Sequence, residues 1–246
     1  MLATARKKAD LTRLEEEFGI QALHLELTNP MSIAECADRA LELTGGKLFA
    51  LFNNAAYGQP GAIEDLSGHA MRQQFEVNVV GTHDLTRRLV TAMRQNRQGR
   101  LVFCSSVLGL IAVPYRGAYC ASKFALEALA DTLRLELNGT GIGVSLIEPG
   151  PISTRFIENS IAAAREHVDI NGSAHSARYA EMLSAMERGG KQTFKLPPNA
   201  VACKLVHAIE SQRPKRRYYV TTPTYLVAAM RRTMPTAVLD WFAARS

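Results

Sequence analysis

Short apolar runs alternate with longer amphipathic segments along most of the chain. The runs are rich in β-branched and large apolar residues, whereas the segments between them are long and periodic enough to be helices. This alternation is typical of a parallel sheet whose strands are joined by crossover helices. We therefore predict an α/β fold with a doubly wound parallel sheet. Its strands are expected at residues 22–27, 48–53, 100–105 and 143–149, with residues 217–222 closing one edge.

The segments between the runs carry helix start and stop signals. Residues 28–46 have a polar cap and a proline before the periodic part and two glycines after it. Longer helical regions are expected at 66–96 and 118–139. No internal repeat interrupts the pattern, so we expect one domain over residues 1–246. Within it, residues 155–197 are polar and poor in strand signals, as expected of a lid over the substrate.

Composition narrows the class of protein further. The chain has 246 residues, of which 47% are hydrophobic, and this is enough for one large domain with a sizeable core. Its four cysteines and six histidines lack the spacing of metal ligands, so no metal is expected. No apolar run is long enough to span a membrane and no leader pattern opens the sequence, so the expected location is the cytoplasm.

The net charge of +6 is concentrated in one basic run, Arg213 to Arg217. A solvated face is the favoured interpretation, while steering of an anionic ligand and contact with an acidic membrane surface stay open. Aromatic residues do not interleave with the basic ones, so nucleic acid is not an expected partner. Residues 222–246 combine apolar runs with arginines. We favour a packed helix pair that covers the core over an anchor on a membrane surface.

Polar residues follow the predicted strands, at the sheet edge where ligands bind in such folds. Ser106 comes directly after the 100–105 strand, and Tyr119 lies 13 residues further on. Lys123 is one turn beyond Tyr119 on the same helix face.

A nearby ammonium favours the phenolate, so Lys123 is expected to lower the pKa of Tyr119 and make it a proton donor or acceptor. Ser106 would hydrogen-bond the same substrate oxygen, and Asn78 would anchor a water that links Lys123 to solvent. Spacing alone leaves open that Tyr119 and Lys123 are a helix pair without a function.

Taken together, the polar motifs resemble those of the short-chain dehydrogenase/reductase family. The family carries N-N-A-G, a helical Asn, a Ser before Y-x-x-x-K, and P-G-x-[IV]-x-T in this order. The matching residues are Asn53 to Ala56, Asn78, Ser106, Tyr119 with Lys123, and Pro149 to Thr154. Ala56 departs from the family pattern, because glycine is usual there. Residues 105–129 and 145–156 are most similar to the branch of 17-beta-hydroxysteroid dehydrogenases, retinol dehydrogenases and bacterial aldehyde reductases.

The resemblance implies a Rossmann-like fold and a role for each matching residue. Tyr119 would be the general acid/base, Lys123 would lower its pKa and hold the nicotinamide ribose, Ser106 would orient the carbonyl, and Asn78 would support the proton relay. Cofactor contacts are implied for Tyr119, Lys123, Asn54, Ile152 and Thr154, and for the Glu26–Leu27 pair beside the adenine.

The choice of cofactor depends on the residues at 2–10. In dinucleotide folds an acidic residue after the second strand binds the ribose 2′-hydroxyl, whereas an arginine there accommodates a 2′-phosphate. Arg6 follows the strand-like residues 2–5 and no acid occurs before Asp10. Because a guanidinium suits a phosphate, we expect NADP rather than NAD, although a solvated helix start stays open.

The family's glycine-rich phosphate loop belongs upstream of residue 2, so we expect the sheet described by this sequence to lack its first strand and helix. Residues 139–144 resemble a glycine fingerprint, but they follow a helix and precede a strand. The needed order is strand, loop, helix, so we interpret this segment as a helix C-cap and a turn.

We expect an NADP-dependent reductase or dehydrogenase that acts on a small apolar carbonyl or alcohol, such as an aldehyde, a retinoid or a steroid ketone. A homo-oligomer is expected. The alternatives are an inactive relative that senses a nucleotide or binds a partner, and a structural interaction protein. A complete set of Asn78, Ser106, Tyr119 and Lys123 argues against both.

Overall fold

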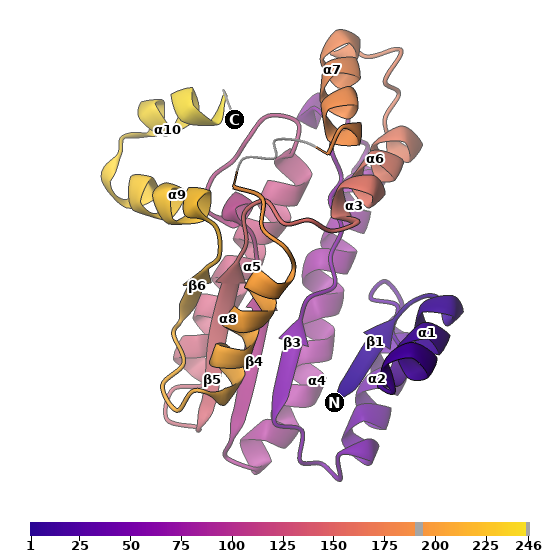
Figure 1. Cartoon of the computed structure of the whole chain (residues 1–246), viewed down its shortest axis with the longest axis vertical. Helices are drawn as coiled ribbons and strands as arrows, with labels where there is room; N and C mark the ends of the chain where they lie inside the picture. Colours follow the sequence, from indigo (N-terminus) through magenta and orange to yellow (C-terminus); the bar gives the residue numbers. More distant parts are fainter. Residues whose placement is uncertain (190–193, 245–246) are drawn as a thin grey trace.

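The strands form two separate parallel sheets in the computed structural model, which describes residues 1–189 and 194–244 (Figure 1). The larger sheet has the order β3-β4-β5-β6, and the smaller one pairs β1 with β2. All pairs are parallel, which confirms the predicted doubly wound α/β class. The strands are β1 (Leu2–Ala5), β2 (Gln21–His24), β3 (Ala50–Asn53), β4 (Gly99–Cys104), β5 (Ile142–Glu148) and β6 (Arg217–Tyr219).

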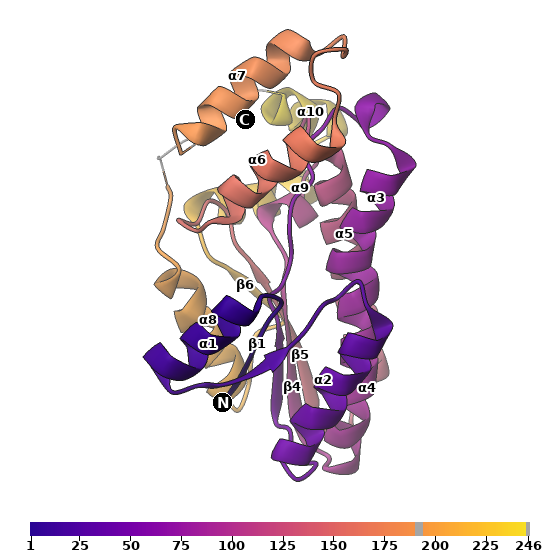
Figure 2. The ribbon, with the colours of Figure 1, turned by 90° about the vertical axis from the view of Figure 1, so that its right-hand side faces the viewer.

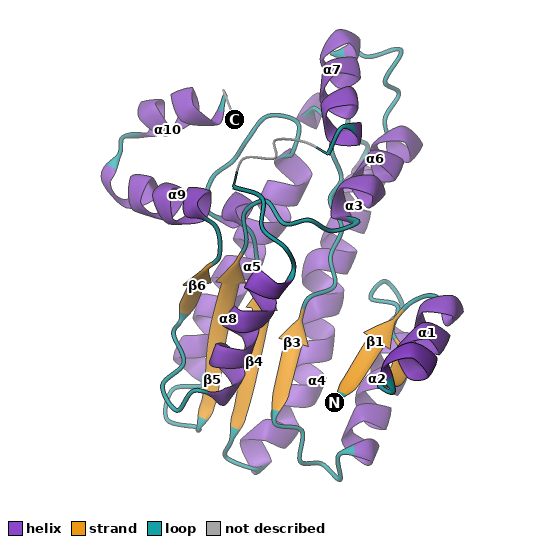
Figure 3. Ribbon diagram, viewed as in Figure 1, coloured by secondary structure: helices purple, strands orange, loops and turns teal. Residues whose placement is uncertain are grey.

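Helices cover both faces of the sheets and gather beyond the carboxyl ends of the strands. Helices α2, α4 and α5 lie on one side of the sheets, with α1 and α8 on the other (Figure 2). Helices α6, α7, α9 and α10 lie beyond the arrowheads of the strands (Figures 1 and 3). The helices are α1 (Lys8–Phe18), α2 (Pro30–Leu43), α3 (Gly68–Phe75), α4 (Thr82–Gln95), α5 (Gly117–Glu136), α6 (Phe156–His167), α7 (Ser176–Glu187), α8 (Asn199–Glu210), α9 (Thr222–Thr233) and α10 (Thr236–Ala243).

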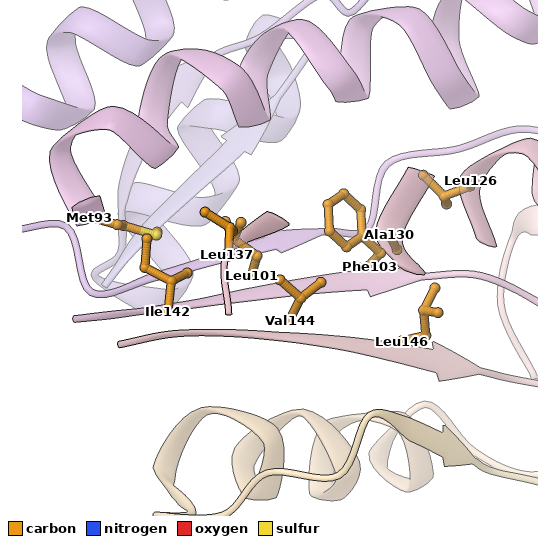
Figure 4. Packing of buried hydrophobic residues seen from close by; sticks show 9 residues of the cluster. All are labelled: Met93, Leu101, Phe103, Leu126, Ala130, Leu137, Ile142, Val144 and Leu146. Carbon is orange, nitrogen blue, oxygen red and sulfur yellow. The ribbon is translucent and has the colours of Figure 1, made fainter. Parts of the chain in front are cut away.

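The main core lies between the larger sheet and helices α4 and α5. Strands β4 and β5 are buried along most of their length, as expected for parallel strands covered on both faces. The buried cluster, drawn in Figure 4, consists of Met93, Leu101, Phe103, Leu126, Ala130, Leu137, Ile142, Val144 and Leu146. This packing fixes the carboxyl ends of β4 and β5, where the predicted site residues begin.

The smaller sheet is attached less firmly. Neither β1 nor β2 has a fully buried residue, and α1 has none either. The attachment runs instead through a second cluster, in which Leu25 and Leu27 pack with α2 and α4. In the described residues β1 pairs only with β2, and β3 only with β4.

Several local expectations are confirmed and others need correction. Strand β6 lies at a sheet edge, as predicted, and Gly139 and Gly141 form a turn with positive φ between α5 and β5. The expected strands at 22–27 and 217–222 are shorter in the structure: the last bonds to the neighbouring strands come from the Leu25 and Val220 N–H groups, and α9 begins at Thr222. Residues 66–96 are not one regular helix, since a π-helical stretch, Glu76–Gly81, separates α3 from α4.

The predicted lid, residues 155–197, contains α6 and α7, and its residues 190–193 lie outside the described residues. Of the helices within 1–189 and 194–244, none has the length and apolar character that a membrane span requires.

Candidate active site

Four predicted catalytic residues meet at the carboxyl end of β4. Ser106 lies two residues beyond the last residue of this strand, Cys104, and Tyr119 and Lys123 lie in the first turns of α5. All three are nearly buried, with exposed fractions of 9%, 8% and 2%. Asn78, 1% exposed, approaches from the π-helical stretch. The fold therefore brings together side chains that are up to 45 residues apart in the sequence.

Lys123 is tied to the end of β4. Its Nζ donates a hydrogen bond to the carbonyl oxygen of Cys104 at 2.8 Å and lies 5.6 Å from the centroid of the Tyr119 ring. Burial lowers the pKa of the Lys123 ammonium, while the nearby Cys104 and the Glu127 carboxyl raise it. The lysine is therefore held in place by a backbone group, whatever else it binds.

The expected lowering of the Tyr119 pKa does not occur in the structure. Burial raises the pKa of Tyr119 well above the usual value of a phenol. A hydrogen bond with Ser106 and the positive charge of Arg116 act in the opposite direction but do not outweigh it. The Lys123 ammonium, 5.6 Å from the ring centroid and itself disfavoured by burial, does not overcome the effect of burial on the phenol. Tyr119 is thus a protonated phenol, suited to donating a proton.

Asn78 holds the framework of the site. Its Oδ1 accepts from the backbone N–H of Tyr57 at 3.1 Å, and its Nδ2 donates to the Tyr57 carbonyl at 3.0 Å and to Ser122 Oγ at 3.1 Å. Ser122 Oγ in turn donates to the Tyr119 carbonyl at 2.8 Å. Asn78 therefore links the loop after β3 to α5, and its predicted part in a water relay stays a prediction.

Sequence reasoning missed two of these supporting groups. Ser122, fully buried, lies inside the Y-x-x-x-K motif, so its position was a usable signal. Gln74, also fully buried, donates to the Tyr57 carbonyl and accepts from the Gln59 N–H at 2.7 Å. A glutamine in an amphipathic helix gives no such signal, because its partners lie on a distant loop.

A buried acidic cluster lies behind Lys123. The Arg217 guanidinium, on β6, forms three ion pairs: with Glu127, with Glu148 at 2.5 Å and with Asp131 at 2.6 Å. Glu148 is fully buried and Glu127 is 6% exposed. Burial, reinforced by Glu127, raises the pKa of Glu148 to about 8, although Arg217 opposes this. Burial also raises the pKa of Glu127. One proton therefore stays on this pair of carboxyls at neutral pH.

Helices α6 and α7 close over the phenol and are fastened to the loop after β3. The ring of Phe156, at the start of α6, lies 5.3 Å from that of Tyr119. Tyr179 of α7, fully buried, donates to Asp65 Oδ2 at 2.8 Å and accepts from the Ala62 N–H at 2.7 Å. His175 Nε2 lies 2.5 Å from Glu64 Oε1.

The residues predicted to select the cofactor lie at the β1–β2 edge. Arg6 follows β1, and its Nε is 3.6 Å from Oε2 of Glu26, which follows β2. The Arg6 side chain is 65% exposed and that of Glu26 25%. Asn54, just after β3, is exposed. Leu27, by contrast, is a core residue at 7% exposure, and Gly81 packs against its carbonyl oxygen.

The last two predicted cofactor residues follow β5. Ile152 forms a single bridge with Leu196 and packs against the cluster under α8, whereas Thr154 is exposed and its Oγ1 accepts from the Phe156 N–H at 3.3 Å. Among the described residues, no hydrogen bond or ion pair joins these residues, Asn54 or the Arg6–Glu26 pair to the catalytic set. Their place along one sheet edge is what they share.

This donor set fits a dinucleotide. A guanidinium and a carboxylate stand at the β1–β2 edge, where an adenosine phosphate and ribose would bind, and a phenol, a hydroxyl and an ammonium stand beyond β4. The Arg6, Glu26 and Asn54 side chains retain accessible polar groups for such a ligand.

Comparison with known proteins agrees with this geometry. The family model described as short chain dehydrogenase matches residues 1–165. The chain is 41% identical to the uncharacterized oxidoreductase YbbO of Escherichia coli over 98% of its own length and 83% of that protein. It is 30% identical to the NADPH-dependent 3-dehydrocapnine reductase of Ornithobacterium rhinotracheale, over 98% of this chain and 86% of that one.

A solved short chain dehydrogenase/reductase from Burkholderia phymatum, in complex with NAD, superposes with a TM-score of 0.76 at 26% identity. The alignment covers 94% of this chain and 82% of that one. The chain therefore belongs to the short-chain dehydrogenase family, and it is an oxidoreductase of this family with a Rossmann fold.

Proposed function

We propose that the protein is an NADP-dependent oxidoreductase that transfers a hydride between the nicotinamide and a carbonyl or alcohol substrate. The observation that carries the proposal is the buried group of Ser106, Tyr119 and Lys123 at the end of β4. A phenol held protonated by burial beside a hydroxyl and an ammonium is an arrangement for protonating a carbonyl oxygen.

Each residue has a defined part in this reaction. The cofactor supplies the hydride. Ser106 donates a hydrogen bond to the carbonyl oxygen and orients it, and Tyr119 transfers its proton to that oxygen as negative charge develops. Lys123, fixed on the Cys104 carbonyl, places a positive charge behind the phenol and stabilises the phenolate that remains. Because Tyr119 is protonated at neutral pH, it is in the form that donates a proton when a carbonyl is reduced.

Arg6 supports NADP as the cofactor. It is the first charged side chain after β1, it is accessible, and it is flanked by Lys7 and Lys8 without an acid before Asp10. The relative named as an NADPH-dependent reductase agrees with this assignment, whereas the solved relative with NAD favours the other cofactor. Glu26, the residue implied beside the adenine, lies 3.6 Å from Arg6 and would compete with a 2′-phosphate for its guanidinium.

The substrate class follows from the apolar cover of the site. The Phe156 ring lies tilted against that of Tyr119. Ile161, Leu183 and Met186 belong to the apolar cluster between α6 and α7. Aldehydes, retinoids and steroid ketones therefore remain the substrate classes we propose, and the cover excludes bulk water from the phenol.

The proposal is tested with a panel of aldehydes and hydroxysteroid ketones, each assayed with NADPH and with NADH. We expect reduction of at least one member, with a higher kcat/KM for NADPH. Absence of turnover, with NADPH bound tightly in a fluorescence titration, would instead support the inactive nucleotide-sensing relative.

A further inference from the structure

Arg116 occupies an unusual position at the start of the catalytic helix. It is the N-cap residue of α5 and precedes Tyr119 by three positions, which is one helical turn. Tyr115, in the left-handed region with φ near 60°, anchors the preceding loop through a hydrogen bond from the Gly61 N–H. Arg116 is therefore held beside the phenol by a fixed backbone.

The guanidinium of Arg116 points to the underside of the lid helices. Its Nη2 donates to Met186 Sδ of α7 at 3.1 Å, and a thioether is only a weak acceptor. None of the ion pairs formed by the described residues includes Arg116. Met186 itself belongs to the apolar cluster of α6 and α7.

Arg217, a second half-buried arginine, shows how acidic neighbours normally compensate a cation removed from water. Arg217 binds three carboxyl groups, and these raise its pKa against the effect of burial. Burial lowers the pKa of Arg116, and the groups that oppose it are Cys120 and Tyr119, which are neutral at pH 7. Among the described residues, Arg217 thus lies in an acidic cluster, whereas the half-buried guanidinium of Arg116 has no acidic partner.

The N-terminus of α5 makes the positive charge of Arg116 still more unfavourable. The N-terminus of a helix carries partial positive charge and favours anions. A cation at the N-cap of a 20-residue helix, partly removed from water, is destabilised by both effects. An anionic group placed between Arg116 and the first turn of α5 would relieve both at once.

We propose that Arg116 binds an acidic group of the substrate, a carboxylate or a comparable oxyanion, while the reacting carbonyl lies at Tyr119. The inference rests on the proposed function and narrows its substrate classes: it selects aldehydes or ketones whose acidic group lies within one helical turn of the carbonyl, over retinoids and steroid ketones that lack such a group. The apolar remainder of the substrate packs against the α6–α7 cluster. Arg116 is then a specificity-determining residue, distinct from the proton donor.

The test compares acids with their esters. The three formylbenzoates, with the carboxylate ortho, meta or para to the aldehyde, are each assayed against the methyl ester with NADPH. Wild type is expected to prefer at least one acid over its ester. Arg116→Gln should reduce kcat/KM for that acid about 10- to 100-fold more than for the ester, mainly through KM. Arg116→Lys should restore part of the preference, because it keeps the charge.

Arg178→Gln is the matched control, since Arg178 is an exposed arginine of the same lid helix that pairs with Glu181. It should leave the ratio of acid to ester unchanged. Equal losses for acid and ester in Arg116→Gln, or a wild-type preference for all three esters, would overturn the proposal.

A binding measurement separates this proposal from the proposed function. The three benzenedicarboxylates, which cannot be reduced, should raise the Tm of wild type and Arg178→Gln but not that of Arg116→Gln. If no aldehyde is turned over, the proposed function fails, and this measurement alone decides the role of Arg116. A rise that is equal in all three proteins, or absent from wild type, contradicts it. Arg116→Met should fold and be at least as stable as wild type, because it removes an uncompensated cation.

Discussion

The four-stranded sheet and the two-stranded sheet hold their functional side chains in different ways. At the end of β4, Tyr119 and Lys123 are buried and hydrogen-bonded or packed on several sides. At the end of β1, Arg6 is 65% exposed and joined only to Glu26, at 3.6 Å. The difference teaches that the proton-transfer residues are part of the buried core, whereas cofactor selection depends on a few solvated charges. Substitutions in the first region should therefore alter stability or rate strongly, and those in the second should alter only affinity.

The largest effect is expected in the acidic cluster of the larger sheet. Arg217→Met should lower the free energy of unfolding by about 3–5 kcal/mol, because it leaves buried carboxyls without their partner. Urea denaturation at pH 7 measures this. The control is Arg216→Met, which removes the exposed neighbouring arginine and should change stability by less than about 0.5 kcal/mol. Equal effects of the two substitutions would show that the cluster does not hold β6 to the core.

Tyr119→Phe should reduce kcat at least about 100-fold, because the proton donor is lost while the ring and its packing remain. Cofactor affinity, measured by fluorescence titration, should stay within about twofold on the same argument. Tyr225→Phe is the control, because the Tyr225 side chain on α9 is exposed. A variant that kept more than a tenth of the wild-type kcat would remove Tyr119 from this role.

Glu148→Gln should make stability less dependent on pH. The folded-state pKa of Glu148, about 8, lies above the ordinary value of 4.5, so the folded protein binds this proton more tightly than the unfolded chain. Its contribution is complete below pH 4.5 and is lost as the pH rises through 8. The fall in unfolding free energy between pH 5 and 9 should therefore be smaller in Glu148→Gln by at least about 1 kcal/mol. Glu42→Gln, exposed on α2, should retain the full fall.

The smallest effects are expected at the β1–β2 edge. Arg6→Gln should weaken NADPH binding by up to about tenfold, because solvent screens an exposed charge. Glu26→Gln should strengthen NADPH binding more than NADH binding, since it frees the Arg6 guanidinium for the 2′-phosphate that NADH lacks. Lys47→Gln, at the opposite end of β3, serves as the control. Parallel changes for both cofactors, measured by calorimetry, would mean that the pair is only structural.

The sequence predicted the buried parts of the fold better than the exposed ones. Strands β4 and β5 lie within one residue of their expected bounds, because both faces of each are apolar. The predicted 22–27 strand is too long, because Leu25 and Leu27 lie beyond β2 and pack against α2 and α4. Apolar character alone does not tell a strand from a buried loop.

The candidate site was predictable where a motif is local and not where partners are distant. Tyr119 and Lys123 share one helix turn, so their proximity follows from the spacing. The Arg217 cluster joins residues 69 to 90 positions apart, and no sequence pattern indicates such an ion pair. The direction of the Tyr119 pKa was wrong for the same reason: burial depends on Phe156 and the lid, which the motif does not contain.

The π-helical stretch at Glu76–Gly81 has a consequence for which changes this protein tolerates. A π-turn contains one residue more than an α-turn, so the stretch behaves as a single-residue insertion in an otherwise continuous helix from α3 to α4. Deleting Val79 would convert the wide turn into an α-turn, and α3 and α4 would keep their present rotation relative to each other. Only the residues of the turn itself would be repositioned, among them Asn78, whose side chain bonds Ser122 and the Tyr57 carbonyl. The extra residue is therefore a requirement of the site and not of the fold: a one-residue deletion here should remove activity while the protein still folds.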